Sequence, residues 1–221
     1  MDEITNLKKE LKVKNIQGLA LDIDETLSWT VGYWMEQMLI NFGNPENLTP
    51  HELVKKYRYS QNVPYWQTSQ IFQWIEEKRR DKTSQLEIPM IENANHIVQK
   101  INQIIPIVAY VTARPKTIKD VTKQWLKKYN FPHAPIIMSP DSIKIEGRSE
   151  WKAKVIETLF PEVVGIIDDN PEFLGFLSKD YQGTIFLYDN VEFEKSLSHI
   201  IPCPTWDGVY KEVRQRFENT V

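Results

Sequence analysis

The chain has little cysteine, little glycine and no long apolar run, and these shortages exclude several classes of protein. Among its 221 residues there is one cysteine, Cys203, so we expect neither an internal disulfide nor a thiolate metal cluster. No apolar stretch approaches the roughly 18 residues of a membrane span. The N-terminal residues are charged and helix-like, without the apolar core of a signal peptide. We therefore expect a cytoplasmic protein that has no membrane partner.

An excess of positive charge is also missing. The chain has 27 basic and 30 acidic side chains and a net charge of −3, which argues against binding a nucleic-acid polymer. Hydrophobic residues make up 41% and charged residues 26%, as in an ordinary soluble globular protein. This length suits one domain, or one domain with an insert.

Five short apolar runs predict strands. They lie at residues 16–23, 107–111, 136–138, 163–167 and 184–188. The runs are nearly continuous rather than alternating, which is typical of strands buried on both faces of a parallel sheet. Helical patterns follow Pro115, Ser149 (a predicted N-cap) and Pro171. We predict an α/β fold with a Rossmann-like parallel sheet at its core.

A long stretch between the first two predicted strands interrupts this alternation of strands and helices. It contains no convincing strand, and its patterns predict helices at about residues 30–41, 50–59, 65–78 and 92–103. Such a stretch is too long for a simple crossover connection. We therefore predict a core domain formed by residues 1–28 and 104–221, with a small α-helical insert at residues 29–103.

Acidic side chains follow two of the predicted strands. Asp22 and Asp24 come at the end of the first, and Asp168 and Asp169 at the end of the fourth. The carboxyl ends of parallel strands meet at one edge of the sheet, where ligands bind. Four carboxylates crowded there would raise one another's pKa values. A hard cation relieves this repulsion, and oxygen ligands without nearby His or Cys favour Mg²⁺.

A lysine adds a positive charge to this set. Lys152 falls early in the helix predicted after Ser149, where the helix dipole disfavours a cation. A nearby phosphate or carboxylate cluster would offset that cost. Lys154, two residues later, faces another side of the helix and is the weaker candidate.

The residues together resemble the motifs of the haloacid dehalogenase-like (HAD) phosphatases. Asp22-x-Asp24-x-Thr26 is similar to the first motif of that family, Thr112 to the second, Lys152 to the third, and Asp168-Asp169 to the fourth. The order and approximate spacing also agree, from residue 16 to about residue 188. In this family, a helical insert after the first motif is a cap domain that closes over the site.

The resemblance implies a role for each residue. Asp22 would attack phosphorus and form an aspartyl-phosphate, and Asp24 would act as general acid and base. Mg²⁺ would be held by Asp22, Asp168 and the main-chain carbonyl of Asp24. Thr112 and Lys152 would hold phosphoryl oxygens, and Asp169 would orient Lys152 or a bound water. The remaining candidates are Thr26 as part of the first motif, Arg114 as a contact of the substrate phosphate or a solvated turn residue, and Trp29 as a residue lining the entrance.

Within the family, the chain is most similar to the small phosphatases near the 5′(3′)-deoxyribonucleotidases. The similarity rests on the cap position and on the segments Thr112–Pro115, Asp168–Pro171 and, more weakly, Pro204–Asp207. Glu25-Thr26 departs from that group and matches HAD acid phosphatases instead. The insert is rich in aromatic residues, which would either stack on a nucleotide or fill the core of the cap.

We therefore predict a Mg²⁺-dependent phosphomonoesterase acting on a small phosphorylated metabolite, with (deoxy)nucleotides among the candidates. Two alternatives stay open. One is a phosphotransferase or phosphomutase acting on a sugar phosphate, and the other is a non-catalytic phosphate-binding protein. The oligomeric state does not follow from the sequence.

Overall fold

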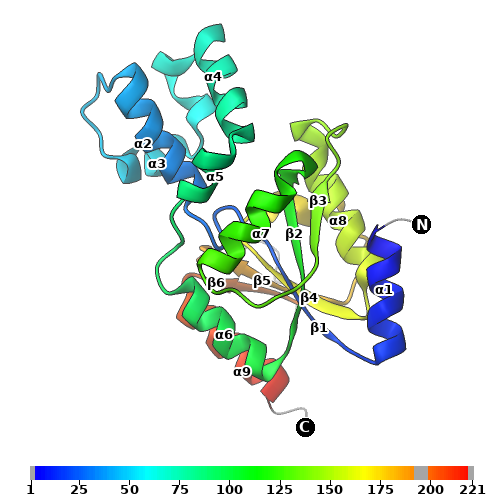
Figure 1. Cartoon of the computed structure of the whole chain (residues 1–221). Coiled ribbons are helices and arrows are strands. Elements are labelled where there is room, and N and C mark those ends of the chain that lie inside the picture. The colour runs from blue at the N-terminus through cyan, green and yellow to red at the C-terminus, as the bar shows by residue number, and fades with distance from the viewer. Residues whose placement is uncertain (1–2, 192–198, 219–221) are drawn as a thin grey trace.

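Six parallel strands form the centre of the molecule (Figure 1). The computed structural model describes residues 3–191 and 199–218; residues 1–2, 192–198 and 219–221, which belong to the predicted core domain, lie outside that description. In chain order the strands are β1 (Gly18–Leu21), β2 (Ile107–Pro115), β3 (Ile136–Ser139), β4 (Val163–Asp168), β5 (Thr184–Tyr188) and β6 (Ile200–Cys203). Their spatial order is β3-β2-β1-β4-β5-β6, which places β1 between β2 and β4.

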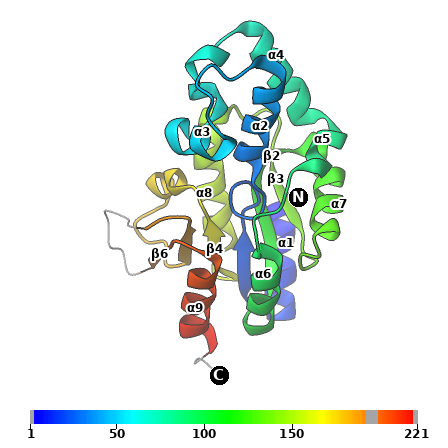
Figure 2. The ribbon, with the colours of Figure 1, turned by 90° about the vertical axis from the view of Figure 1, so that its left-hand side faces the viewer.

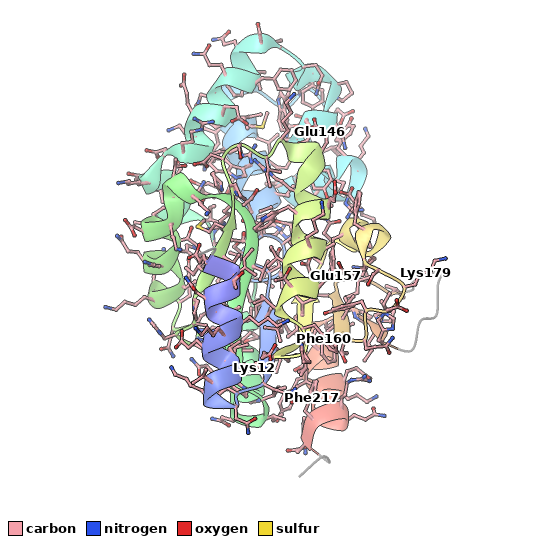
Figure 3. All side chains as sticks on the ribbon, turned by 90° about the vertical axis from the view of Figure 1, so that its right-hand side faces the viewer. Lys12, Glu146, Glu157, Phe160, Lys179 and Phe217 are labelled. Atoms are coloured by element: carbon pink, nitrogen blue, oxygen red, sulfur yellow. The ribbon has the colours of Figure 1, made fainter. Side chains whose placement is uncertain are left out.

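Helices cover both faces of the sheet. The helices are α1 (Glu3–Lys14), α2 (Thr30–Phe42), α3 (Pro50–Tyr57), α4 (Ser69–Arg80), α5 (Lys82–Glu87), α6 (Ala94–Ile104), α7 (Lys119–Lys128), α8 (Arg148–Leu159) and α9 (Trp206–Phe217). One apolar cluster joins the sheet to α6, α7 and α9, and a second joins its other face to α1 and α8. Figure 3 looks onto α1 and α8, where Lys8 Nζ donates to the carbonyl of Phe160 at 2.6 Å. The predicted α/β fold is confirmed.

The apolar runs form strands because both of their faces are covered. All four residues of β1 are buried, as are the first six of β2. Strand β6 was not predicted, since it has four residues, Ile-Ile-Pro-Cys, and lies at the sheet edge, where proline is tolerated.

Helices α2, α3 and α4 form a separate body above the carboxyl ends of the strands (Figures 1 and 2). Their apolar cluster includes Met35, Met38, Leu53 and Trp66, all fully buried, whereas α5 packs on α7. Local signals set their starts, because Thr49 forms a capping box with Glu52 and the Thr68 side chain accepts a hydrogen bond from Ile71 N. The sequence therefore encodes these helices locally and gives them a core of their own.

Helix α6 belongs with the sheet. Its buried residues Ile97, Val98 and Ile101 lie in the cluster that includes β1 and α9. The predicted division at residues 29–103 thus includes a helix that packs on the core. The division into domains itself stays a prediction.

Several predicted helix starts differ in the structure. Strand β2 continues to Pro115, which pairs with Ser139, so α7 begins only after a short 3₁₀ turn at Lys116–Ile118. Ser149 is not an N-cap, because the 3₁₀ turn at Ile145–Gly147 leads into α8 two residues earlier, with Gly147 at the N-cap position. After Asn170, the chain forms the 3₁₀ helix Pro171–Phe176 rather than an α-helix.

Within the described ranges 3–191 and 199–218, the helices are too short or too polar to cross a membrane.

Candidate active site

The first motif, Lys152 and the fourth motif meet where β1 and β4 end. Asp22 follows β1 directly and donates its backbone N–H to Ile167 O at 3.0 Å, while Asp168 is the last residue of β4. Side chains separated by 146 positions therefore become neighbours because β1 and β4 are adjacent parallel strands.

Three carboxylates gather at this edge. Asp22, Asp168 and Asp169 each offer an oxygen within 4.8 Å of the others, and Asp22 and Asp168 are buried. Burial raises the pKa of Asp22 to about 7, and the charges of Asp168 and Asp24 add to this against the opposing effect of Lys152. Burial also raises the pKa of Asp169 well above its usual value, with Asp168 and Asp22 adding to the rise.

Lys152 is the cation that lies between these carboxylates. Its Nζ is 2.9 Å from Asp22 Oδ1 and 2.7 Å from Asp168 Oδ2, and its side chain is 7% exposed. Burial lowers the pKa of Lys152, but Asp168 and Asp22 raise it by more, so the lysine stays charged. Lys154 points elsewhere: it is exposed and pairs with Glu150 at 2.5 Å. Residues two apart on a helix face different sides, which separates the two candidates.

One ammonium does not balance three clustered carboxylates, two of which are buried. The donors offered at this point are oxygens, and the set Asp22, Asp168 and Asp169 has the size and chemistry of a site for a hard divalent cation. Burial is the main cause of the raised pKa values of Asp22 and Asp169, and the negative charges of the neighbouring carboxylates add to it. The residues present therefore fit the predicted metal.

Asp24 makes a different set of contacts. Its carboxylate accepts from Arg114 Nε at 3.0 Å and Nη2 at 2.7 Å, and from Thr30 Oγ1 at 2.7 Å. Burial would raise the pKa of Asp24, but Arg114 and Thr30 together hold it below its usual value. Arg114 is neither solvated nor free, since it is 4% exposed and its guanidinium also lies 5.8 Å from the ring of Trp125.

A tight turn within the first motif is hydrogen-bonded to the fourth motif. Glu25 has a φ of 58°, and its N–H donates to Ser28 O at 2.8 Å. Thr26 is fully buried, and its hydroxyl both donates to Asp169 Oδ1 and accepts from Asp169 N, each at 3.1 Å. Trp206 Nε1 donates to Thr26 O at 3.2 Å. Thr26 therefore positions Asp169, and the Trp206 segment supports the turn.

Thr112 lies within β2, the strand next to β1. It is fully buried, and its Oγ1 accepts the N–H of Arg114 at 3.2 Å. Thr112 thus contacts the backbone of Arg114, the residue whose side chain pairs with Asp24.

Trp29, the residue expected to line the entrance of the site, does not border the cavity at Asp24. Its ring stacks on His51, with centroids 4.5 Å apart, and it borders a hollow with Pro89 and Met90 rather than the cavity at Asp24. The reason is local: Gly32 lacks a Cβ, and a Cβ there would come within 1.9 Å of the Trp29 ring. The indole therefore folds back over the start of α2.

A cavity of about 540 Å³ lies between the helical body and the end of β2. Asp24 and Arg114 line it from the sheet, and Trp34, Tyr59 and Phe72 line it from the helical insert. Arg79 of α4 and Arg148 of α8 also border it. The sequence does not indicate that either arginine lines the cavity, because each has the local pattern of a solvated helix residue and no motif includes it.

The aromatic residues of the insert lie in two different places. Trp66 is fully buried in the core of the helices, whereas Trp34 and Tyr59 border the cavity. Tyr59 is also close enough to Asp169 and Glu172 for their charges to contribute to its raised pKa, after the larger effect of burial. The loop after α3 therefore contributes Tyr59 to the cavity that Asp24 borders.

Comparison with known proteins supports the fold. The family model "PITM 1-3, LNS2 domain" matches residues 78–168, which is less than half of the chain. No curated protein of significantly similar sequence was found.

Two solved structures share the overall fold. A HAD-superfamily hydrolase of subfamily IA, variant 1, from Geobacter sulfurreducens PCA has a TM-score of 0.55 at 10% identity, over 90% of this chain and 96% of its own. A protein designated a β-phosphoglucomutase, from Thermotoga maritima, has a TM-score of 0.52 at 14% identity, over 93% of this chain and 100% of its own. A cytosolic 5′-nucleotidase IIIB bound to cytidine reaches 0.42 at 12% identity, over 96% of this chain and 90% of its own, too low a score to carry an argument.

At these identities the likeness establishes the fold alone. The chain has the fold of the HAD hydrolases, as the motifs implied. The similarity to the deoxyribonucleotidase group stays a prediction.

Proposed function

We propose that the protein is a divalent-metal-dependent phosphomonoesterase of the HAD type that acts on a small phosphorylated substrate, with Asp22 as its nucleophile. The observation that supports this most directly is the place of Asp22. The Asp22 carboxylate is buried in a cluster of three acids and lies 2.9 Å from Lys152 Nζ. Asp22 itself follows β1, which pairs with β2, the strand that contains Thr112. A non-catalytic phosphate site would not need so many buried carboxylates, because they repel an anion.

Asp22, Asp168 and Asp169 would hold the metal, which we propose to be Mg²⁺, together with the main-chain carbonyl of Asp24. When bound, the ion would neutralise charge on the phosphoryl group. Lys152 would then contact a phosphoryl oxygen from the other side, and the hydroxyl of Thr112 would help to hold that group.

The covalent steps use Asp22 and Asp24. A carboxylate oxygen of Asp22 attacks phosphorus, the bond from phosphorus to the ester oxygen breaks, and Asp24 donates a proton to the departing oxygen. A water then attacks the phosphorus, Asp24 takes its proton, and the bond to Asp22 breaks to release phosphate. Asp24 borders the cavity, which puts it on the side where the leaving group would lie.

Helices α2–α5 would act as the cap over this site. The separate core of α2, α3 and α4 and the place of Tyr59 in the cavity that Asp24 also borders support that role. Since α6 packs on the sheet, we propose that the cap ends near residue 91 rather than at residue 103. The cytoplasmic location, the substrate and the lack of nucleic-acid and membrane partners remain predictions.

The test is phosphate release from a panel of phosphomonoesters, with and without Mg²⁺. The panel should hold deoxyribonucleotides, ribonucleotides, sugar phosphates and an aryl phosphate. Metal-dependent release of phosphate is the expected result. Formation of an isomeric sugar phosphate without free phosphate would indicate a phosphomutase instead, and no reaction with any compound would contradict the proposal.

A further inference from the structure

Three arginines from three distant segments border the cavity next to Asp24. Arg79 comes from α4, Arg114 from the end of β2 and Arg148 from the first residue of α8. A second hollow of about 160 Å³ shares Arg79 and Arg148 and adds Arg80. Glu146, labelled in Figure 3, marks the place where the start of α8 meets the helical insert. Positive side chains therefore converge on this point from both the core and the insert.

The acidic residues of the cavity leave part of this positive charge unpaired. Asp24 engages Nε and Nη2 of Arg114, and Glu76 engages Nη1 of Arg79 at 3.0 Å. Glu146 is exposed and makes no ion pair within the described part of the chain. The guanidinium of Arg148 has neither a hydrogen bond nor an ion pair to any described residue.

Two buried nitrogen atoms in the cavity lack an acceptor. They are Nε of Arg148 and Nη1 of Arg114, and the Arg114 side chain is 4% exposed. A buried N–H group without an acceptor destabilises the folded protein, and the cost is greater when the group is charged. Burial lowers the pKa of Arg148, and the nearby charge of Arg79 lowers it further, against the opposing effects of Glu76, Asp24 and Glu146. An anion placed among these groups would remove both costs.

We propose that this cavity binds a second anionic group of the substrate, a carboxylate or a phosphate, through Arg148, Arg114 and Arg79. Arginine suits this role because its planar fork of donors matches both oxyanions. The apolar side chains of Trp34, Phe72 and Ile75 border the same space and would contact the body of the leaving group. This inference rests on the proposed function, because the first anion is the phosphate at Asp22, and it narrows the substrate to a phosphate monoester with a further negative charge.

The test compares phosphonates, which mimic a phosphate ester and are not hydrolysed. Para-carboxybenzyl phosphonate carries the second anion, and para-carbamoylbenzyl phosphonate has nearly the same shape with an uncharged amide in place of the carboxylate. A third ligand has a second phosphonate in place of the carboxylate. Affinities are measured by titration calorimetry with Mg²⁺ for the wild type, Arg148→Gln, Arg148→Lys and Lys154→Gln. The last variant removes one charge from an exposed position on the same helix.

We expect the wild type to bind at least one of the two ligands with a second anionic group about tenfold more tightly than the carbamoyl ligand. Arg148→Gln should reduce that preference to about threefold or less. Arg148→Lys should restore part of the preference, and Lys154→Gln should keep all of it. The ligand that the wild type binds more tightly shows whether the subsite prefers a carboxylate or a phosphate group. Equal affinities in the wild type, or a preference that Arg148→Gln leaves unchanged, would overturn the inference.

The same ligands separate this inference from the proposed function. Hydrolysis is measured in parallel with the corresponding aryl phosphates. Phosphate release without a preference for the second anion contradicts the anion subsite alone. Preferential binding without any phosphate release supports the subsite and contradicts the phosphatase assignment.

Discussion

Arg114 holds the carboxylate of Asp24 with two of its nitrogens. Nε lies 3.0 Å from Oδ1 and 3.1 Å from Oδ2, and Nη2 lies 2.7 Å from Oδ1. The two residues are 90 positions apart and come together because their strands are neighbours. This ion pair keeps the pKa of Asp24 low, which favours the form that accepts a proton over the form that donates one.

Replacing Arg114 should therefore change the pH dependence of turnover. In Arg114→Gln the pKa of Asp24 rises, because the nearby positive charge is lost while burial remains. Asp24 would then stay protonated to higher pH, and the basic limb of the kcat/KM profile should move up by about one pH unit. Arg114→Lys retains a charge and should shift the limb less. A limb that stays in place in Arg114→Gln would mean that Asp24 is not the general acid.

Asp22→Asn should abolish turnover while the protein stays folded. Asparagine fills the same space but cannot attack phosphorus, so the rate should fall by about 10³-fold or more. Lys152 keeps its contact with Asp168 at 2.7 Å in this variant, so the buried ammonium retains a partner. Circular dichroism and a thermal melt check the fold. Asp120→Asn makes the same chemical change at an exposed position and should leave the rate unchanged; substantial activity in Asp22→Asn would reassign the nucleophile.

Magnesium should stabilise the folded protein through the carboxylate cluster. A ligand that binds only the native state adds about 1.4 kcal/mol when its concentration is ten times its Kd. The melting temperature of the wild type should therefore rise with added Mg²⁺ and return with a chelator. Asp168→Asn removes one of the three clustered carboxylates and should reduce the shift, whereas Asp120→Asn should retain it. An equal shift in the Asp168 variant would place the metal elsewhere.

Glu25 should make the protein less stable as the pH rises. Burial raises the pKa of Glu25 from about 4.5 to about 7, although its carboxylate accepts the N–H of Val31 at 2.6 Å. A folded-state pKa above the unfolded value means that ionisation disfavours the native state, so stability is lost from about pH 4.5 upward until the folded pKa is passed.

Glu25→Gln keeps an acceptor for Val31 and removes the charge. Its free energy of unfolding should exceed that of the wild type at pH 8 by on the order of 1 kcal/mol, and the gap should close near pH 5. Denaturant titrations at the two pH values, in buffer without divalent metal, measure this difference. A constant gap across pH would show that Glu25 does not titrate between them.

Much of the fold and part of the candidate site could be predicted from the sequence. Apolar runs such as residues 163–167 can be buried on both faces only in a covered parallel sheet, so the fold class follows from the pattern. Asp22 and Asp168 stand at the ends of such runs and had to meet at one edge. Strand β6 escaped prediction because four residues that include a proline carry too weak a signal.

The sequence by itself determined strands β1–β5, helices α2–α4 of the insert and the set of carboxylates at the strand ends, since each depends on local pattern or on strand direction. Only the tertiary structure decided that Lys152 rather than Lys154 contacts Asp22, and that Trp29 turns away from the cavity. It also brought Arg79, Arg114 and Arg148 together. These three arginines come together because of the way the helical insert packs on the core, and the spacing of residues along the chain does not determine that packing.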